Sequence, residues 1–278
     1  MIMLELGDNE FQRIRDIMYA HSGVCLSAHK KQLVISRLRK RLADLKLAGF
    51  QDYLGLIERP GSTEMSNFIN AITTNETYFF RHSAQFNVLY EKILPELVAA
   101  KRGGAEPLKL WSAACATGEE PYSLAITCLE FFKMSRAPIK WVVYASDIND
   151  EVLERAKRGF FPDRSLRKTP DPIKDRYFYR VHSDEDPRQA GYELDHALKG
   201  RVEFLTHNLL APFVYMDMDV VFLRNAMIYF DETARHKVTG LVTRAMRSGG
   251  YLFISPSESL KAEDYGLLPY GSSIYRKL

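Results

Sequence analysis

Two adjacent carboxylates, Glu119 and Glu120, follow a run of small residues and stand at the start of a predicted helix. The run, SAACATGEEPYS at 112–123, comes directly after a short apolar strand, and small side chains in such a turn let a ligand approach the backbone. Turns that bind pyrophosphate need several glycines and a helix N-terminus free of acids, whereas this turn has only Gly118 and two carboxylates. The pattern therefore disfavours a diphosphate.

A ligand with a ribose, an amino-acid ammonium group and a sulfonium cation would meet no repulsion at this turn. S-adenosylmethionine has all three groups, so the turn favours that ligand. The alternative is that Glu119 and Glu120 only stabilise the first helical turn through the helix dipole.

Asp147 gives a second indication of the same ligand. Apolar residues from Trp141 to Ala145 run into Ser146 and Asp147, and Asn149 then begins a helix. An acid at the carboxyl end of a strand in such a sheet accepts hydrogen bonds from ribose hydroxyls, and bonds to a charged acceptor are stronger than neutral ones. The alternative is that Asp147 only caps the turn between strand and helix.

A third segment, TTNETYFFR at 73–81, places three aromatic residues between hydrogen-bonding side chains and an arginine. Together with five other motifs, it resembles the chemotaxis receptor-glutamate methyltransferases, the CheR family. The six motifs occur in the family's order over nearly the whole chain. They are TTNETYFFR, SAACATGEEPYS, ASDIN at 145–149, HNLL at 207–210, FLRNAMIYFD at 222–231 and GGYLFISPSES at 249–259.

The resemblance implies transfer of a methyl group from S-adenosylmethionine to glutamate side chains on the cytoplasmic helical bundle of chemoreceptors. The products would be a glutamate methyl ester and S-adenosylhomocysteine. The family's cofactor contacts map onto Asn75, Thr77, Arg81, Glu120, Asp147, Asn208, Leu209, Arg224 and Asn225.

By this analogy Arg81 pairs with the cofactor's carboxylate, since a guanidinium group matches a carboxylate bidentately. Glu120 would bind the ammonium group and Asp147 the ribose. Asn208 and Leu209 would lie beside the adenine.

The implied acceptor explains why the sequence shows no catalytic triad. A glutamate carboxylate has an ordinary pKa of about 4.3, so it is ionised and nucleophilic at pH 7 without a general base. The enzyme then needs mainly to align and desolvate the reacting groups. Arg224 and Tyr229 are candidates for steering the incoming glutamate, although residues at a strand end can equally be structural.

The expected fold class is α/β: a Rossmann-like class I methyltransferase domain with a helical N-terminal domain. Residues 1–72 are expected to form the helical domain, 73–106 a motif loop and linker helix, and 107–278 the methyltransferase domain. Strands are predicted at Leu108–Trp111, Ile139–Ala145, Val202–Leu205, Val220–Leu223 and Tyr251–Ile254.

The resemblance also implies a small antiparallel β-subdomain inserted at about residues 160–200. In some family members this subdomain holds a short peptide from the receptor's C-terminus. The segment YFYRVHSDEDPRQAG at 177–191 lacks a glycine-rich binding loop, so the sequence leaves this tethering open.

Composition excludes several other classes of protein. No stretch approaches the roughly 18 apolar residues of a membrane span, and no signal peptide is evident, so we expect a cytoplasmic protein without direct membrane insertion. Cys25, Cys115 and Cys128 are too widely spaced for a zinc site or a disulfide framework, and no metal is expected. A net charge of +3 is too small to indicate nucleic acid as a partner.

Basic residues are concentrated between Lys30 and Lys46, where seven stand against one acid and apolar residues recur at helical spacing. This pattern predicts an amphipathic helix with a cationic outer face that could dock an acidic partner. With the receptor bundle that the resemblance implies as this partner, reversing the charge of Arg37 and Arg41 would raise the KM for receptor. The alternatives are a solvated face and an RNA-binding surface. Accordingly, an RNA or small-molecule methyltransferase, and a nonenzymatic adaptor that responds to S-adenosylmethionine, stay in contention as functions.

Overall fold

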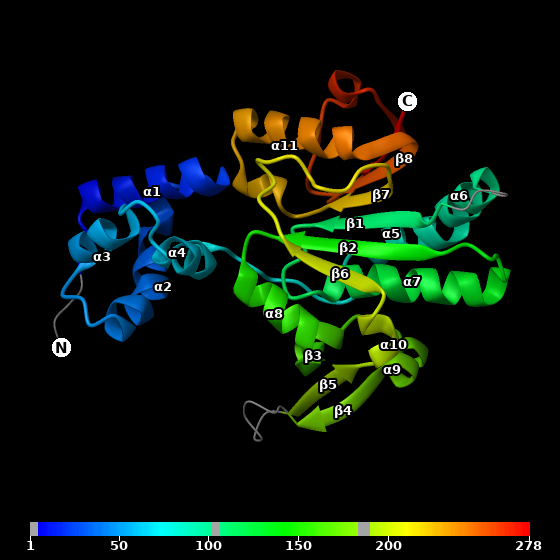
Figure 1. Cartoon of the computed structure of the whole chain (residues 1–278), viewed down its shortest axis with the longest axis horizontal. Helices are drawn as coiled ribbons and strands as arrows, with labels where there is room; N and C mark the ends of the chain where they lie inside the picture. The colour runs from blue at the N-terminus through cyan, green and yellow to red at the C-terminus, as the bar shows by residue number, and fades with distance from the viewer. Residues whose placement is uncertain (1–4, 102–105, 183–189) are drawn as a thin grey trace.

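The computed structural model describes residues 5–101, 106–182 and 190–278, and its first part is a bundle of short helices (Figure 1). Apolar residues at helical spacing face the centre of this bundle, where Phe50, Tyr53 and Phe68 are almost completely buried. The all-helical N-terminal domain is therefore confirmed. Its elements are α1 (Asp8–Ser22), η1 (Ala28–Lys30), α2 (Lys31–Asp44), α3 (Phe50–Ile57) and α4 (Glu64–Ile72).

The second part is built on a seven-stranded sheet with the strand order β6-β2-β1-β7-β8-β10-β9. Strands β6, β2, β1, β7 and β8 run parallel, whereas β10 is antiparallel to both its neighbours. The strands are β1 (Leu108–Ala113), β2 (Trp141–Asp147), β6 (Val202–Thr206), β7 (Met218–Leu223), β8 (Met246–Ile254), β9 (Leu267–Gly271) and β10 (Ile274–Lys277).

All the parallel strands predicted from apolar runs are present. The antiparallel pair β9 and β10 was not predicted, because β9 contains Pro269 and β10 carries charged residues. Neither strand shows the continuous apolar run of a buried parallel strand.

Helices cover both faces of this sheet. Because side chains alternate along a strand, Leu108 and Leu110 of β1 pack with the helices of one face, and Trp111 and Ala113 pack with the other. The first face carries α5 (Ser83–Val88), η2 (Leu89–Ile93), α6 (Leu94–Ala100), α7 (Glu119–Ser135) and α8 (Asp150–Arg158), and the second carries α11 (Glu232–Ala245). The short turns η4 (Met227–Tyr229) and η5 (Ala262–Tyr265) join the later elements.

A small three-stranded antiparallel sheet, in the order β3-β5-β4, lies beside the main sheet (Figure 1). It falls within the predicted insertion at 160–200, so the fold class predicted from the sequence is confirmed. The acidic run 183–186 lies outside the described residues. The elements of this subdomain are β3 (Phe160–Phe161), η3 (Asp163–Leu166), α9 (Asp171–Tyr177), β4 (Phe178–His182), β5 (Ala190–Leu194) and α10 (His196–Lys199).

Candidate cofactor site

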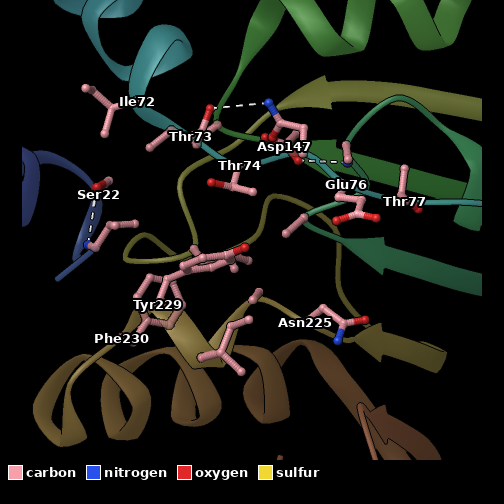
Figure 2. Close-up of a pocket in the computed structure, with 18 of the residues that line it drawn as sticks. Ser22, Ile72, Thr73, Thr74, Glu76, Thr77, Asp147, Asn225, Tyr229 and Phe230 are labelled. Carbon is pink, nitrogen blue, oxygen red and sulfur yellow. Dashed lines mark hydrogen bonds between the residues drawn. The ribbon is translucent and has the colours of Figure 1, made fainter. Parts of the chain in front are cut away.

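A cavity of about 380 Å³ lies where the carboxyl ends of β1, β2, β6 and β7 meet the helical domain. Its volume is within the range of small-molecule sites, about 300–1,000 Å³. Figure 2 shows that its walls come from both parts of the chain, with Ser22 and Ile72 from the helical domain and Asp147 and Tyr229 from the sheet domain. The predicted site residues all line it: Asn75, Thr77, Arg81, Glu120, Asp147, Asn208, Leu209, Arg224, Asn225 and Tyr229.

The small-residue turn after β1 has a strained backbone. Ala114 and Ala116 both have left-handed backbone angles, with φ of 64° and 49°, and Gly118 has φ of 96°. A Cβ atom at Gly118 would lie 2.8 Å from the Cβ atom of Ala156, so this position requires glycine for space as well as for φ. Such strain is concentrated at functional sites, and here it brings the backbone of 114–116 to the cavity wall.

Glu120 faces the cavity and is held by a buried ion pair. Its Oε2 atom accepts a hydrogen bond from Nε of Arg224 at 2.8 Å, and its Oε1 atom accepts one from the Ser112 hydroxyl at 2.7 Å. Each carboxylate oxygen keeps lone-pair capacity for one more donor. Glu120 is therefore oriented toward the cavity and able to accept from a ligand cation.

Glu119 has a different role from its neighbour. Its Oε2 atom accepts from the Thr117 hydroxyl at 2.6 Å and its Oε1 atom from the Ser165 hydroxyl at 2.8 Å, and the residue does not line the cavity. Burial raises the pKa of Glu119 above its ordinary value. Of the two adjacent acids, only Glu120 is available to a ligand.

Arg224 is almost completely enclosed, with a side-chain exposure of 1%. Besides Glu120, its Nη1 atom donates to the carbonyl oxygen of Arg81 at 2.7 Å and to Oε1 of Gln85 at 2.9 Å. The guanidinium group thus ties the turn after β1 to the motif at 73–81. All three hydrogen-bond acceptors of Arg224 are therefore groups of the protein itself.

Asp147 both shapes the turn and faces the cavity. Its Oδ2 atom accepts from the backbone N–H of Ala116 at 2.9 Å and its Oδ1 atom from that of Asn149 at 3.0 Å. Burial raises the pKa of Asp147, and these backbone hydrogen bonds oppose the rise. One carboxylate therefore both caps the turn and faces the cavity.

The motif at 73–81 connects the two domains. Thr73 accepts a hydrogen bond at Oγ1 from Nδ2 of Asn149 at 2.8 Å, and its carbonyl oxygen accepts from Nη1 of Arg37 at 2.8 Å. The side chain of Arg37 also bonds to the carbonyl oxygen of Ile72 and to the Thr74 hydroxyl. Arg37 and Asn149 thus fix one wall of the cavity, and sequence reasoning assigned neither of them this role.

Asn208 lies at the cavity wall, but its amide is already engaged. Its Nδ2 atom donates to the carbonyl oxygen of His21 at 2.6 Å, and its Oδ1 atom accepts from the backbone N–H of Leu210 at 3.0 Å. The side chain of Leu209 is buried beside it, and Nε2 of His207 is buried without a partner among the described residues. The HNLL motif therefore also attaches α1 to the sheet domain.

Asn225 and Tyr229 belong to the loop after β7. Asn225 has a left-handed backbone with φ of 59°, and its N–H donates to Oε2 of Glu258 at 3.1 Å. The carbonyl oxygen of Tyr229 accepts from the N–H of Cys25 at 2.8 Å, so this loop also contacts the helical domain. Tyr229 lines the cavity, and Figure 2 shows its ring among the lining residues.

The part of the chain that the structure describes shows neither a cluster of metal ligands nor a helix that could span a membrane. Within 5–101, 106–182 and 190–278 no group of three or more His, Cys, Asp or Glu side chains is arranged to hold a metal ion. In the same part of the chain, no helix has the length and apolar character needed to cross a membrane.

Comparison with known proteins places this geometry in a family. Residues 75–270 match the family model "CheR methyltransferase, SAM binding domain", and residues 9–73 match "CheR methyltransferase, all-alpha domain".

Similar proteins include the chemotaxis protein methyltransferase of Escherichia coli K12, 36% identical, with 98% of this chain and 92% of that protein covered. The chemotaxis protein methyltransferase of Salmonella typhimurium LT2 is 38% identical, with 92% and 85% covered. Chemotaxis protein methyltransferase 2 of Pseudomonas aeruginosa PAO1 is 35% identical, with 96% and 92% covered. The chain therefore belongs to the CheR family of S-adenosylmethionine-binding methyltransferases.

Proposed function

We propose that this protein uses S-adenosylmethionine to methylate glutamate side chains of chemoreceptors, forming glutamate methyl esters for signalling adaptation. The observation that carries this proposal is the single cavity lined by every residue that matches the family's cofactor contacts. The family membership of the chain supports it.

The charges of the cavity fit S-adenosylmethionine better than a diphosphate. Three acids, Glu76, Glu120 and Asp147, line it, and the first turn of α7 carries Glu119 and Glu120, so the N-terminus of α7 is not an electropositive site open to phosphate. We assign Arg81 to the cofactor's carboxylate, Glu120 to its ammonium group and Asp147 to its ribose. Asn208 and Leu209 are assigned to the adenine. Asn75, Thr77 and Asn225 complete the walls.

The protein's own contribution is positioning. Bound S-adenosylmethionine supplies an electrophilic methyl group, and the incoming glutamate is already ionised at neutral pH. The cavity walls exclude water from the reacting groups and hold them within attack distance, which lowers the entropic cost of reaching the transition state. We assign Arg224 a positioning role through Glu120 and Arg81, because its guanidinium group contacts both of those residues.

Tyr229 is the remaining candidate for steering the substrate, because it lines the cavity and its hydroxyl forms no hydrogen bond with another of the described residues. Tyr229→Phe is expected to lower kcat roughly tenfold, the equivalent of one hydrogen bond of about 1.4 kcal/mol to a charged group. The affinity for S-adenosylhomocysteine, measured by calorimetry, should stay unchanged. Unchanged kcat for this variant would assign Tyr229 a structural role.

The function itself is tested by the chemistry of the product. Incubation with methyl-labelled S-adenosylmethionine and a cytoplasmic chemoreceptor fragment should label the fragment, and mild alkali should release the label as methanol, because an ester hydrolyses and an N-methyl group does not. Label in RNA, or label that resists alkali, would favour the alternative methyltransferases. Tight cofactor binding with no transfer to any receptor would favour the adaptor.

Docking of the receptor bundle on the basic helix is a further part of the proposal, and the structure changes which residues should test it. Arg37 bonds to the chain at 72–74, and Arg41 forms an ion pair with Glu64 at 2.6 Å. Replacing either residue would disturb the fold of the helical domain. Arg39 and Lys40 are exposed and have no ion-pair partner among the described residues, so they are the better probes.

Arg39→Glu/Lys40→Glu is expected to raise the KM for receptor about fivefold to tenfold and to weaken its salt dependence, because two attractive contacts become repulsive. The affinity for S-adenosylhomocysteine should not change. Lys237→Glu/Arg244→Glu on α11 makes the same charge change at exposed positions away from the cavity, and it serves as the matched control. Equal KM values for the two variants would leave the basic helix as a solvated face.

Two further assignments stay predictions. Binding of a receptor C-terminal peptide at the small sheet can be tested by calorimetry with such peptides, and residues 183–189 lie outside the described residues. A cytoplasmic location follows from the proposed substrate, whose methylated bundle is cytoplasmic.

A further inference from the structure

A second group of cations stands on the inserted subdomain. Arg164, Arg167 and Lys168 are all exposed, and they lie on and directly after η3. We call these three residues the cationic ridge. The acid of the same segment, Asp163, is paired with Arg180 at 3.2 Å, so it does not neutralise them. Within the described residues, no carboxylate forms an ion pair with any residue of the ridge.

The ridge is held rigidly against the motif at 73–81. The backbone N–H of Phe79 donates to the carbonyl oxygen of Ser165 at 2.9 Å, and the Ser165 hydroxyl donates to Oε1 of Glu119 at 2.8 Å. Ser165 and Leu166 are buried between the exposed cations. Because these bonds fix the backbone of η3, little backbone entropy would be lost when a partner binds the ridge.

A row of side chains connects the ridge to the cavity. The guanidinium carbon of Arg167 lies 4.0 Å from the ring centroid of Tyr78, and that of Arg81 lies 5.8 Å from the same centroid. Arg81 lines the cavity. The positive surface therefore begins inside the site, at a residue assigned to the cofactor, and continues over Tyr78 to the exposed cations.

We infer that the cationic ridge is a second docking surface for the acidic, glutamate-bearing helix of the receptor, an inference that rests on the proposed function. The ridge offers positive charges to acidic side chains of a helix whose glutamate enters the cavity, and Tyr78 joins the ridge to Arg81 of the cavity lining. The basic residues of α2 belong to the helical domain and the ridge to the inserted subdomain, which Figure 1 shows on different sides of α8. Two separate anchors fix the direction in which the helix crosses the site.

The test reverses two charges at exposed side chains that form no hydrogen bond or ion pair with another side chain among the described residues, so the fold should be retained. Arg164→Glu/Lys168→Glu is expected to raise the KM for a purified cytoplasmic chemoreceptor fragment about fivefold to tenfold. The slope of KM against salt concentration should become shallower. The kcat value and the affinity for S-adenosylhomocysteine should equal those of the wild type. The neutral variant Arg164→Gln/Lys168→Gln should show a smaller rise in KM.

Arg136→Glu/Lys140→Glu is the matched control, because both residues are exposed and precede β2, at the amino end of the sheet opposite the cavity. A ridge variant with the same KM and salt slope as this control overturns the inference and leaves the proposed function intact. If the wild type transfers no alkali-labile label to the fragment, the proposed function and the inference both fail. Wild-type binding to anionic vesicles or RNA that is lost in the ridge variant, with KM unchanged, would assign the ridge to those partners instead.

Discussion

Replacing Arg224 with methionine is expected to lower the free energy of unfolding by about 3–5 kcal/mol and to weaken binding of S-adenosylhomocysteine. The guanidinium group of Arg224 donates to Glu120, to the Arg81 carbonyl oxygen and to Gln85 from a side chain that is 1% exposed. Methionine fills a similar length without any donor. The buried Glu120 carboxylate then keeps only the Ser112 hydroxyl, and two neutral acceptors lose their partner.

The affinity loss follows from the position of these partners. Glu120 and Arg81 both line the cavity, and Arg224 joins them directly. Without this connection, the relative positions of Glu120 and Arg81 are no longer fixed. These residues are assigned to the cofactor's ammonium group and carboxylate, so both contacts with the cofactor weaken. Chemical denaturation measures the stability, and calorimetry with S-adenosylhomocysteine measures the affinity.

A double-mutant cycle with Glu120→Gln separates the ion pair from other effects. Glutamine carries no charge to leave buried, so Arg224→Met should cost less in the Glu120→Gln background, with a coupling energy of about 1–3 kcal/mol. The affinity of the double variant for S-adenosylhomocysteine should remain lower than that of the wild type, because the Glu120 carboxylate is absent. Arg136→Met, at an exposed residue, is the control and should change neither quantity.

A different outcome would restore the steering role considered for Arg224 from the sequence. If Arg224→Met folded with wild-type stability, bound S-adenosylhomocysteine normally and raised only the KM for receptor, its guanidinium group would have to contact the substrate. The hydrogen bonds of Arg224 to Glu120, Arg81 and Gln85 argue against that result.

The parallel strands and the cavity lining were predictable because each depends on a local pattern. Buried strands appear as apolar runs, and cavity-lining residues such as Asp147 lie at their carboxyl ends, which meet at one edge of a parallel sheet. The helical domain was predictable from apolar residues at helical spacing. Family motifs then identified residues such as Asn75 and Asn225, for which spacing alone gives no role.

Contacts between distant segments were not predictable. Arg37 was read as part of a cationic outer face, yet its guanidinium group binds the chain at 72–74, 35 or more residues away in sequence. Glu119 and Glu120 are neighbours of the same type, and only the helical rotation at the start of α7 directs one to Ser165 and the other to the cavity. A sequence pattern gives the face of an element but not its partner.

Asp147→Asn is expected to raise the Kd for S-adenosylhomocysteine roughly 30-fold to 100-fold, the equivalent of about 2–3 kcal/mol for losing charge-assisted hydrogen bonds. Both carboxylate oxygens of Asp147 already accept a backbone N–H, from Ala116 and from Asn149. Asparagine has one acceptor oxygen, so its NH₂ group must face one of those donors. The variant therefore also disturbs the turn that approaches the ligand. Asp150→Asn, three residues further along and outside the cavity lining, keeps an acceptor oxygen and should leave the Kd unchanged.

The pH dependence of binding provides a second test of the same carboxylate. Burial is the largest influence on Asp147 and raises its pKa above the ordinary value of 3.8. The ionised carboxylate is the better acceptor of hydrogen bonds from the ribose hydroxyls. The affinity for S-adenosylhomocysteine should therefore fall as the pH decreases through this raised pKa and the carboxylate takes up a proton. Asp147→Asn cannot titrate and should lose this acidic limb, with weak binding at every pH. If the wild type and the variant showed the same pH profile, another group would have to bind the ribose.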